Sequence, residues 1–430
     1  MTPIQIGIIG CILMVVLFAL SVPVAISMVV VGTIGFAVLV DPTAALNILV
    51  TDFFSTFSSY SFTTMPLFVL MGTLCFYSNV SKKLYDCAYT ILGHIRGGLA
   101  IATVAACALF GAISGSSNAA AASMGRVCLP EMDRYRYDKS LSTVSVAAAG
   151  CLGILIPPSG IMIIYGVQTE QSISKLFMAG LVPGIVLTIL MCISVSITCR
   201  RNPDAGPAGP KTTFMEKVKS TSGIFDMLLL FVVCIGGMQF GWFTPTQGGA
   251  IGAFGAFLLG KIRRTLSWKD TFRALRETAE MTCMVLAICA GATVFGHFMA
   301  VSRIPATLSA TVASMNVPHF VIMIVIILIY LLGGCFMDSL ALIMLTVPIF
   351  YPVVTGMGYD PIWFGVIIVI AASMGLITPP VGLNVYIIGN QVPDVGLPTI
   401  FKGIWPYLID MFILAALLMI FPQMATWVNM

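Results

Sequence analysis

Charged side chains are scarce in this sequence of 430 residues, at 9% of the total, whereas soluble domains carry roughly a quarter. Apolar residues make up 59% of the chain, and the stretch from Gly7 to Val40 contains no charged residue at all. Such a stretch could not remain dissolved in water. The composition therefore excludes a soluble enzyme and indicates an integral membrane protein.

Several chemical signatures are also missing. The 12 Cys are scattered without a CxxC pair, and the three His form no cluster, so no metal site is predicted. No basic tract points to a nucleic-acid partner. The segment Gly255 to Lys261 approaches a phosphate-binding loop, but Ile262 replaces the required Ser or Thr. No His is placed to activate Ser114 as a nucleophile. These absences argue against an enzyme.

The apolar segments instead predict an all-α polytopic membrane protein. A crossing needs about 20 mostly apolar residues, and ten segments qualify: about 5–20, 22–40, 61–79, 141–167, 176–199, 223–242, 246–261, 279–299, 361–389 and 403–424. With both termini outside the cytoplasm, all 21 Lys and Arg except Lys175 and Arg303 fall on one side. An excess of Lys and Arg marks the cytoplasmic side, so we predict this orientation.

Two further apolar stretches, 99–130 and 319–352, are too long for one crossing. Each is interrupted near its middle by small polar residues, Ser114 to Asn118 in the first and Met337 to Ser339 in the second. Both predict re-entrant helical hairpins whose tips stop inside the membrane. More polar segments predict helices lying on the membrane surface, at 42–58, 82–98, 263–278 and 301–318.

The two halves of the chain repeat one another. The segment LGILIPPSGI at 152–161 matches MGLITPPVGL at 374–383, so that Pro157 and Pro379 stand 222 positions apart. Five predicted crossings separate the hairpins, and this odd number predicts that the repeats are inverted. Inverted repeats with broken helices are typical of secondary transporters, whose binding site lies near the midplane of the membrane, although channels also contain re-entrant loops.

Both repeats contain a Pro-Pro pair between glycines, at 153–160 and 375–382. Proline removes backbone donors and breaks the helix. The freed carbonyl groups, with the Thr378 hydroxyl, could bind a cation such as Na⁺, whereas a plain proline kink is the alternative. Asp338 is the only ionisable residue in the middle of either hairpin, and such a carboxylate indicates a functional cation partner. A proton-coupled carrier or exchanger, or an ion channel, that uses Asp338 stays open as an alternative.

These patterns predict a division of the chain into scaffold and transport regions. The scaffold is expected at 1–60 and 223–278, and the polar segment 201–222 is expected as a cytoplasmic linker. The first transport repeat is expected at 61–200, with hairpin 99–130 and broken helix 141–167. The second is expected at 279–430, with hairpin 319–352 and broken helix 361–389.

Four motifs carry a resemblance to a known family: FGAISGSSNAAAASMG at 110–125, GCLGILIPPSGIMIIYG at 150–166, CFMDSLALIM at 335–344 and MGLITPPVGLNVYIIG at 374–389. The chain resembles the large membrane subunit of tripartite ATP-independent periplasmic (TRAP) transporters, the DctM-like family. This resemblance implies an elevator-type, Na⁺-coupled importer in the bacterial inner membrane, with both termini periplasmic. It also implies two partners, a small four-helix membrane subunit and a periplasmic substrate-binding protein.

The resemblance further implies at least two Na⁺ sites and a small organic acid anion as substrate, of the dicarboxylate, sialic acid or sulfonate type. One Na⁺ would be bound by Ser114 and Asn118 with backbone groups of Gly153, Ile156 and Pro158. A second would lie near Asp338, Gly375, Thr378 and Pro380. Polar side chains near the same breaks are candidate substrate contacts: Ser116, Ser117, Ser159, Ser339 and Asn384.

Overall fold

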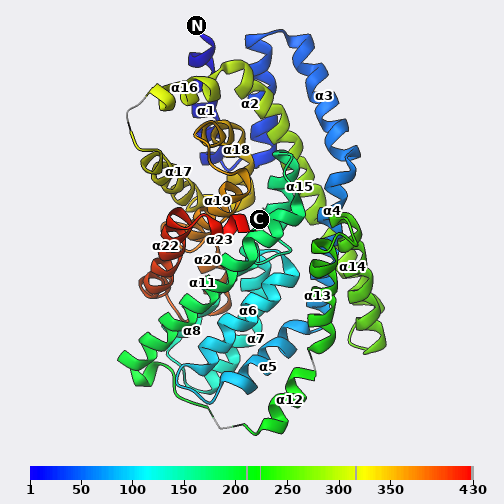
Figure 1. Ribbon diagram of the computed structural model, residues 1–430, viewed down its shortest axis with the longest axis vertical. Helices are drawn as coiled ribbons and strands as arrows, with labels where there is room; N and C mark the ends of the chain where they lie inside the picture. The colour runs from blue at the N-terminus through cyan, green and yellow to red at the C-terminus, as the bar shows by residue number, and fades with distance from the viewer. Residues whose placement is uncertain (210–211, 223, 315–316, 428–430) are drawn as a thin grey trace.

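The computed structural model describes residues 1–209, 212–222, 224–314 and 317–427. Within these ranges every regular element is a helix (Figure 1). Five of the described helices are long and apolar enough to cross a membrane, or six if one bent pair is counted as a single span. The described fold is therefore all-α, as the apolar segments predict. Residues 210 and 211 of the predicted linker 201–222 lie outside the described ranges.

The first half of the chain forms the following helices: α1 (Pro3–Ala19), α2 (Val24–Leu39), α3 (Pro42–Ser58), η1 (Tyr60–Thr63), α4 (Thr64–Tyr77), α5 (Val80–Leu92), α6 (Gly98–Ser114), α7 (Ser117–Arg134), α8 (Lys139–Gly150), α9 (Leu152–Leu155), α10 (Gly160–Gln168) and α11 (Ile173–Arg201). Two short helices follow between the halves, η2 (Pro203–Ala205) and α12 (Phe214–Ser222).

The second half forms a matching series: α13 (Phe225–Gln239), α14 (Pro245–Ile262), α15 (Trp268–Ser302), α16 (Ile304–Ser314), α17 (His319–Gly334), α18 (Ser339–Gly356), α19 (Pro361–Gly375), α20 (Leu383–Gln391), α21 (Leu397–Gly403), α22 (Trp405–Ile420) and α23 (Gln423–Thr426). A shift of 222 positions places the first and last residues of α7 on the first and last residues of α18. The same shift places Asp138 on Asp360, and these two carboxylates cap the starts of α8 and α19.

The contacts between the halves are reciprocal. Helix α2 packs against α15, and α4 packs against α14. Helix α14 is the equivalent of α2, and the later part of α15 is the equivalent of α4. The contact between α2 and α15 therefore corresponds to the contact between α14 and α4, with the two halves exchanged. These reciprocal contacts agree with the repeat of 222 positions in the sequence. Helices α5 and α16, which are also equivalent, lie at opposite ends of the long axis (Figure 1).

Helix α15 differs from the prediction. The sequence pattern separates a surface helix at 263–278 from a crossing at 279–299, whereas the structure forms one continuous helix of 35 residues. At 1.5 Å per residue this helix is roughly 50 Å long. The polarity changes near Glu280, but no Pro or Gly stands between Trp268 and Ala290 to end the helix. The predicted boundary between 278 and 279 therefore falls inside a single element.

The breaks occur where the sequence predicts them. Helices α6 and α7 pack against each other across a turn at Gly115 and Ser116, and α17 and α18 do the same across residues 335–338. The broken helices are interrupted at 156–159 and at 376–382, and both Pro-Pro peptide bonds there are cis. Helices α8 and α19 are almost entirely buried, which places the first halves of both broken helices at the centre of the protein.

Candidate functional site

The two broken helices touch each other just before their breaks. The thiol of Cys151 donates a hydrogen bond to the backbone carbonyl of Ser373, with a distance of 3.4 Å between sulfur and oxygen. These residues are 222 positions apart and are therefore equivalent in the repeat. The two breaks therefore begin close to each other.

Each hairpin lies against the broken helix of its own half through glycines. A Cβ atom on Gly111 would lie 2.5 Å from Cα of Gly153, and one on Gly375 would lie 2.2 Å from the carbonyl carbon of Gly334. Any side chain at these positions would push the hairpin away from the break. Small residues allow close backbone approach between helices, and here they bring each polar tip to the unwound backbone.

The tip of the first hairpin is fixed directly to its break. Gly115 has a φ of +62°, which favours glycine, and a Cβ atom there would lie 2.6 Å from the carbonyl oxygen of Pro158. The backbone N–H of Gly160 donates a hydrogen bond of 3.3 Å to the Gly115 carbonyl. The Pro158 carbonyl therefore faces the hairpin tip, as a cation ligand at this position requires.

The two hairpin tips also meet each other. The side-chain amide of Asn118 donates a hydrogen bond to Oδ1 of Asp338, with a distance of 3.3 Å. The other oxygen of Asp338 accepts from the backbone N–H of Leu340 at 3.0 Å and caps α18. The equivalent residue, Ser116, caps α7. The carboxylate thus lies beside the N-terminus of α18 and close to the first turn of α7, where helix dipoles stabilise negative charge.

A small cavity of about 130 Å³ lies between the tips, and we call it the tip cavity. It is bounded by both hairpins, by the first break and by the apolar faces of α4 and α15. The lining residues are Met65, Phe68, Val69, Ser114, Gly115, Ser116, Ser117, Asn118, Ile154, Pro158, Gly160, Ile161, Met281, Met284, Val285, Asp338, Ser339, Leu340 and Leu376.

The polar atoms of the tip cavity suit a hard cation. Among the described residues, Oδ1 of Asn118 and Oγ of Ser339 are buried without a hydrogen-bond partner. Carboxylate, amide and hydroxyl oxygens are the ligands that hard cations prefer. No group of three or more His, Cys, Asp or Glu within the described residues could hold a metal ion. The donor set therefore fits Na⁺ better than a transition metal.

The structure brings half of the predicted site residues to this cavity. Ser114, Ser116, Ser117, Asn118, Pro158, Asp338 and Ser339 all line it. The sequence interpretation assigns Asn118 and Asp338 to different Na⁺ sites, whereas the structure places them in contact.

The other predicted residues do not line the tip cavity. Gly153 and Gly375 are contact points for the hairpin regions, and Ile156 is buried. Ser159 is buried and caps α10, Thr378 donates to the carbonyl of Met374 at 2.7 Å, and Pro380 is exposed.

Asn384 has a bridging position. Its buried side-chain amide donates to Oγ of Ser117 at 2.8 Å and to the carbonyl of Ala147 at 3.0 Å. It thereby connects the second broken helix to the first hairpin and to α8. The apolar residues Met281 and Met284 were missed as lining residues, because their segment has the composition of an ordinary membrane crossing.

One protein family matches nearly the whole chain, including both hairpins and both broken helices. The family described as "Tripartite ATP-independent periplasmic transporter, DctM component" matches residues 11–424. The chain belongs to this family. The resemblance that the four motifs carry is thereby confirmed, and membership in a transporter family argues for transport rather than enzyme catalysis.

Several relatives of DctM type are similar along nearly their full length. The C4-dicarboxylate TRAP transporter large permease protein DctM of Pseudomonas aeruginosa is 35% identical over 382 residues, which cover 88% of this chain and 89% of the relative. The sialic acid large permease protein SiaM of Vibrio cholerae is 32% identical over 95% of this chain and 94% of its own. The ectoine/5-hydroxyectoine large permease protein UehC of Ruegeria pomeroyi is 28% identical over 97% of both chains.

Two solved structures share the fold at low sequence identity. The YdaH transporter of Alcanivorax borkumensis superposes with a TM-score of 0.59 at 14% identity and covers 89% of both chains. MtrF of Neisseria gonorrhoeae superposes with a TM-score of 0.56 at 14% identity, over 100% of this chain and 95% of its own. The first is described as a transporter and the second as one of a class of antimetabolite efflux pumps. At this identity the likeness shows that the chain shares their fold.

Proposed function

We propose that this DctM chain is the large membrane subunit of a Na⁺-coupled symporter that imports a small organic acid anion. The observation that carries the proposal is the tip cavity. There, two hairpin tips and a broken helix bring together one carboxylate, an unpartnered amide oxygen and several hydroxyl groups. In a membrane interior such groups need a charged or polar partner, and Na⁺ is a suitable one.

The Na⁺ ligands in this proposal are those that the family resemblance implies. Ser114, Asn118 and the backbone of Gly153, Ile156 and Pro158 would hold one ion, and Asp338 with Gly375, Thr378 and Pro380 would hold a second. The hydrogen bond between Asn118 and Asp338 makes the two ligand sets adjacent. Na⁺ would supply positive charge in the tip cavity, and the carboxylate of Asp338 would balance part of that charge.

The substrate class rests on charge and on the relatives. The tip cavity contains no Lys or Arg, so an anion bound there would be balanced by Na⁺ and by helix N-termini. The named substrates of relatives are C4-dicarboxylates, sialic acid, isethionate and ectoine. Candidate contacts from this chain are the hydroxyl groups of Ser116, Ser117, Ser159 and Ser339, with Asn384 nearby.

The assembly and the motion complete the proposal. In the bacterial inner membrane, with both termini periplasmic, the chain works with a small four-helix membrane subunit and a periplasmic substrate-binding protein. The repeats are inverted in the bilayer, and the hairpins move as an elevator. Because α4 and α15 pack against α14 and α2, we place α4 and α15 with the scaffold. All of α4 falls within the predicted transport repeat 61–200, and the part of α15 from residue 279 onward falls within the predicted transport repeat 279–430.

Uptake into proteoliposomes tests this function. The purified complex, with its cognate binding protein outside, should take up substrate at least about tenfold faster under an inward Na⁺ gradient than with choline replacing Na⁺. The substrate is chosen by a thermal-shift screen of the binding protein against organic acids. The Na⁺ dependence should be cooperative, because more than one ion binds. Equal uptake in choline would refute the proposal, uptake driven by pH alone would favour proton coupling, and flux far above carrier rates would favour a channel.

A further inference from the structure

A second cavity of about 280 Å³ adjoins the tip cavity, and we call it the vestibule. Val69, Ser114, Ser116 and Met281 line both cavities, so the two spaces share a wall. Ligand pockets usually enclose roughly 300 Å³ or more, a size that the tip cavity alone does not reach. The other lining residues of the vestibule are Gly72, Thr73, Phe76, Tyr77, Phe110, Ala119, Ala122, Ser123, Arg126 and Glu277.

One face of α7 forms a wall of the vestibule and ends in a positive charge. Ser116, Ala119, Ala122, Ser123 and Arg126 line it, at the spacing of residues on a single helix face. On this face the residues between Ser116 and Arg126 are small, so no large side chain separates the hairpin tip from the guanidinium group. Ten residues of helix correspond to about 15 Å. Because side chains lean toward the N-terminus of a helix, Arg126 reaches back toward the tip.

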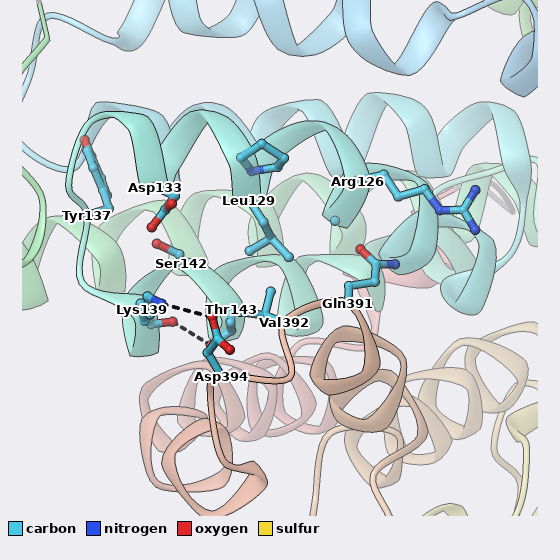
Figure 2. Close-up of a pocket in the computed structure, with 12 residues that line it drawn as sticks. Arg126, Leu129, Asp133, Tyr137, Lys139, Ser142, Thr143, Gln391, Val392 and Asp394 are labelled. Carbon is cyan, nitrogen blue, oxygen red and sulfur yellow. Dashed lines mark hydrogen bonds and ion pairs between the residues drawn. The ribbon is translucent and has the colours of Figure 1, made fainter.

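Arg126 is the only cationic side chain among the residues that line either cavity. The carboxylate of Glu277, across the vestibule, accepts a hydrogen bond from the hydroxyl of Tyr77. Arg126 also borders a third cavity, of about 500 Å³, on the other side of α7. In that cavity its guanidinium group points away from Asp133, Tyr137 and Lys139 (Figure 2), and Lys139 pairs with Asp394 at 3.8 Å.

A second polar group lies on the same wall. Ser123 is 3% exposed, and its hydroxyl has no hydrogen-bond partner among the described residues. A buried hydroxyl without a partner is costly in a membrane protein unless a ligand or water contacts it. Ser123 and Arg126 are three positions apart on the helix and therefore neighbours.

We propose that Arg126 and Ser123 form an anion subsite that holds a carboxylate or sulfonate group of the substrate in the vestibule. That the subsite holds the substrate rests on the proposed function. That it prefers anions rests only on the residues that line the vestibule. The planar guanidinium group matches a carboxylate with two parallel hydrogen bonds, and the hydroxyl adds a third. The subsite lies on the side that the Lys and Arg pattern assigns to the cytoplasm. An anion that moves from the tip cavity toward the cytoplasm therefore meets the fixed positive charge of Arg126.

Charge-selective labelling of a cysteine tests the subsite. Ala122→Cys places a thiol on the vestibule wall one helical turn from Arg126. In the purified complex, its reaction rate is measured with an anionic reagent, sulfonatoethyl methanethiosulfonate, and with a cationic one, trimethylammonioethyl methanethiosulfonate. Peptide mass spectrometry counts only the label at position 122. Relative to a free thiol, the anionic reagent should be favoured, and Arg126→Gln should lower this preference by roughly three- to tenfold.

The matched control is Arg134→Gln in the same background. Arg134 is also on α7, but it is exposed, contacts Glu131 at 3.9 Å and does not line the vestibule. Its loss should leave the preference unchanged. An unchanged preference in Arg126→Gln, an equal fall in Arg134→Gln, or no labelling at position 122 by either reagent would each overturn the proposal. Because the labelling requires no transport, a failure of Na⁺-driven uptake would refute the proposed function without affecting this result.

Discussion

The substitution Asp338→Asn should reduce Na⁺-driven uptake by more than about tenfold in a protein that still folds. Asp338 carries the only ionisable side chain among the residues that line the tip cavity. Asparagine has the same shape and is an equally good cap for α18, so its amide oxygen can still accept from the backbone N–H of Leu340. Its amide nitrogen is a donor and replaces the oxygen that accepts from Asn118. The substitution removes the negative charge, and losing one charged interaction costs roughly 1.5–3 kcal/mol, which is about tenfold or more.

Asp138→Asn is the matched control for this substitution. Asp138 also caps a helix, because its carboxylate accepts a hydrogen bond of 3.0 Å from the backbone N–H of Leu141, but it does not line the tip cavity. The control should transport at the wild-type rate. If Asp338→Asn kept both the wild-type rate and the wild-type Na⁺ dependence, Asp338 would not be a Na⁺ ligand.

A disulfide between the second hairpin (α17 and α18) and α15 should stop transport almost completely until it is reduced. A Cβ atom on Gly296 would lie 3.8 Å from Cβ of Pro348, and disulfides join residues whose Cβ atoms are about 3.5–4.5 Å apart. Gly296 is on α15, which packs against α2, and Pro348 is on α18. If the hairpins move against α2 and α15, the Gly296→Cys and Pro348→Cys pair holds them in one position. Uptake is measured before and after reduction.

A second disulfide, placed within the scaffold, controls for oxidation and crosslinking. The hydroxyl groups of Thr64 on α4 and Thr246 on α14 lie 2.7 Å apart. A Thr64→Cys and Thr246→Cys pair should crosslink and leave uptake near the wild-type rate. Both pairs are made in a Cys283→Ser background, since Cys283 is an exposed cysteine. Full uptake with the 296–348 disulfide formed would exclude the moving-hairpin mechanism and favour local gating around a fixed site.

The sequence predicts the breaks of this fold well because each one has a local cause. The prolines at 157–158 and 379–380 end helices wherever they stand. The polar interruption around Ser116 likewise follows from composition. The continuity of α15 was not predictable from polarity, since a helix passes from a polar to an apolar stretch without breaking when no Pro or Gly intervenes.

The assembly of the candidate site depends on packing that no local pattern records. Asn118 and Asp338 are 220 positions apart, and their contact depends on glycines that bring each hairpin onto its broken helix. Gly153 and Gly375 were predicted as positions of carbonyl ligands, and the structure shows them as the points of closest backbone approach. Arg126 stands outside every quoted break, so its place on the wall of the vestibule becomes visible only once α4, α7 and α15 are packed together.

We propose that Na⁺ binds between the hairpin tips, and the melting temperature of the purified complex tests this binding without a substrate. An ion that binds only the folded state stabilises it by about 2.7 kcal/mol at a hundred times its dissociation constant. NaCl should therefore raise the melting temperature above that in choline chloride of equal ionic strength, and Asp338→Asn should abolish most of this difference. Identical melting temperatures of the wild-type complex in the two salts, across the full range of concentrations, would contradict the account.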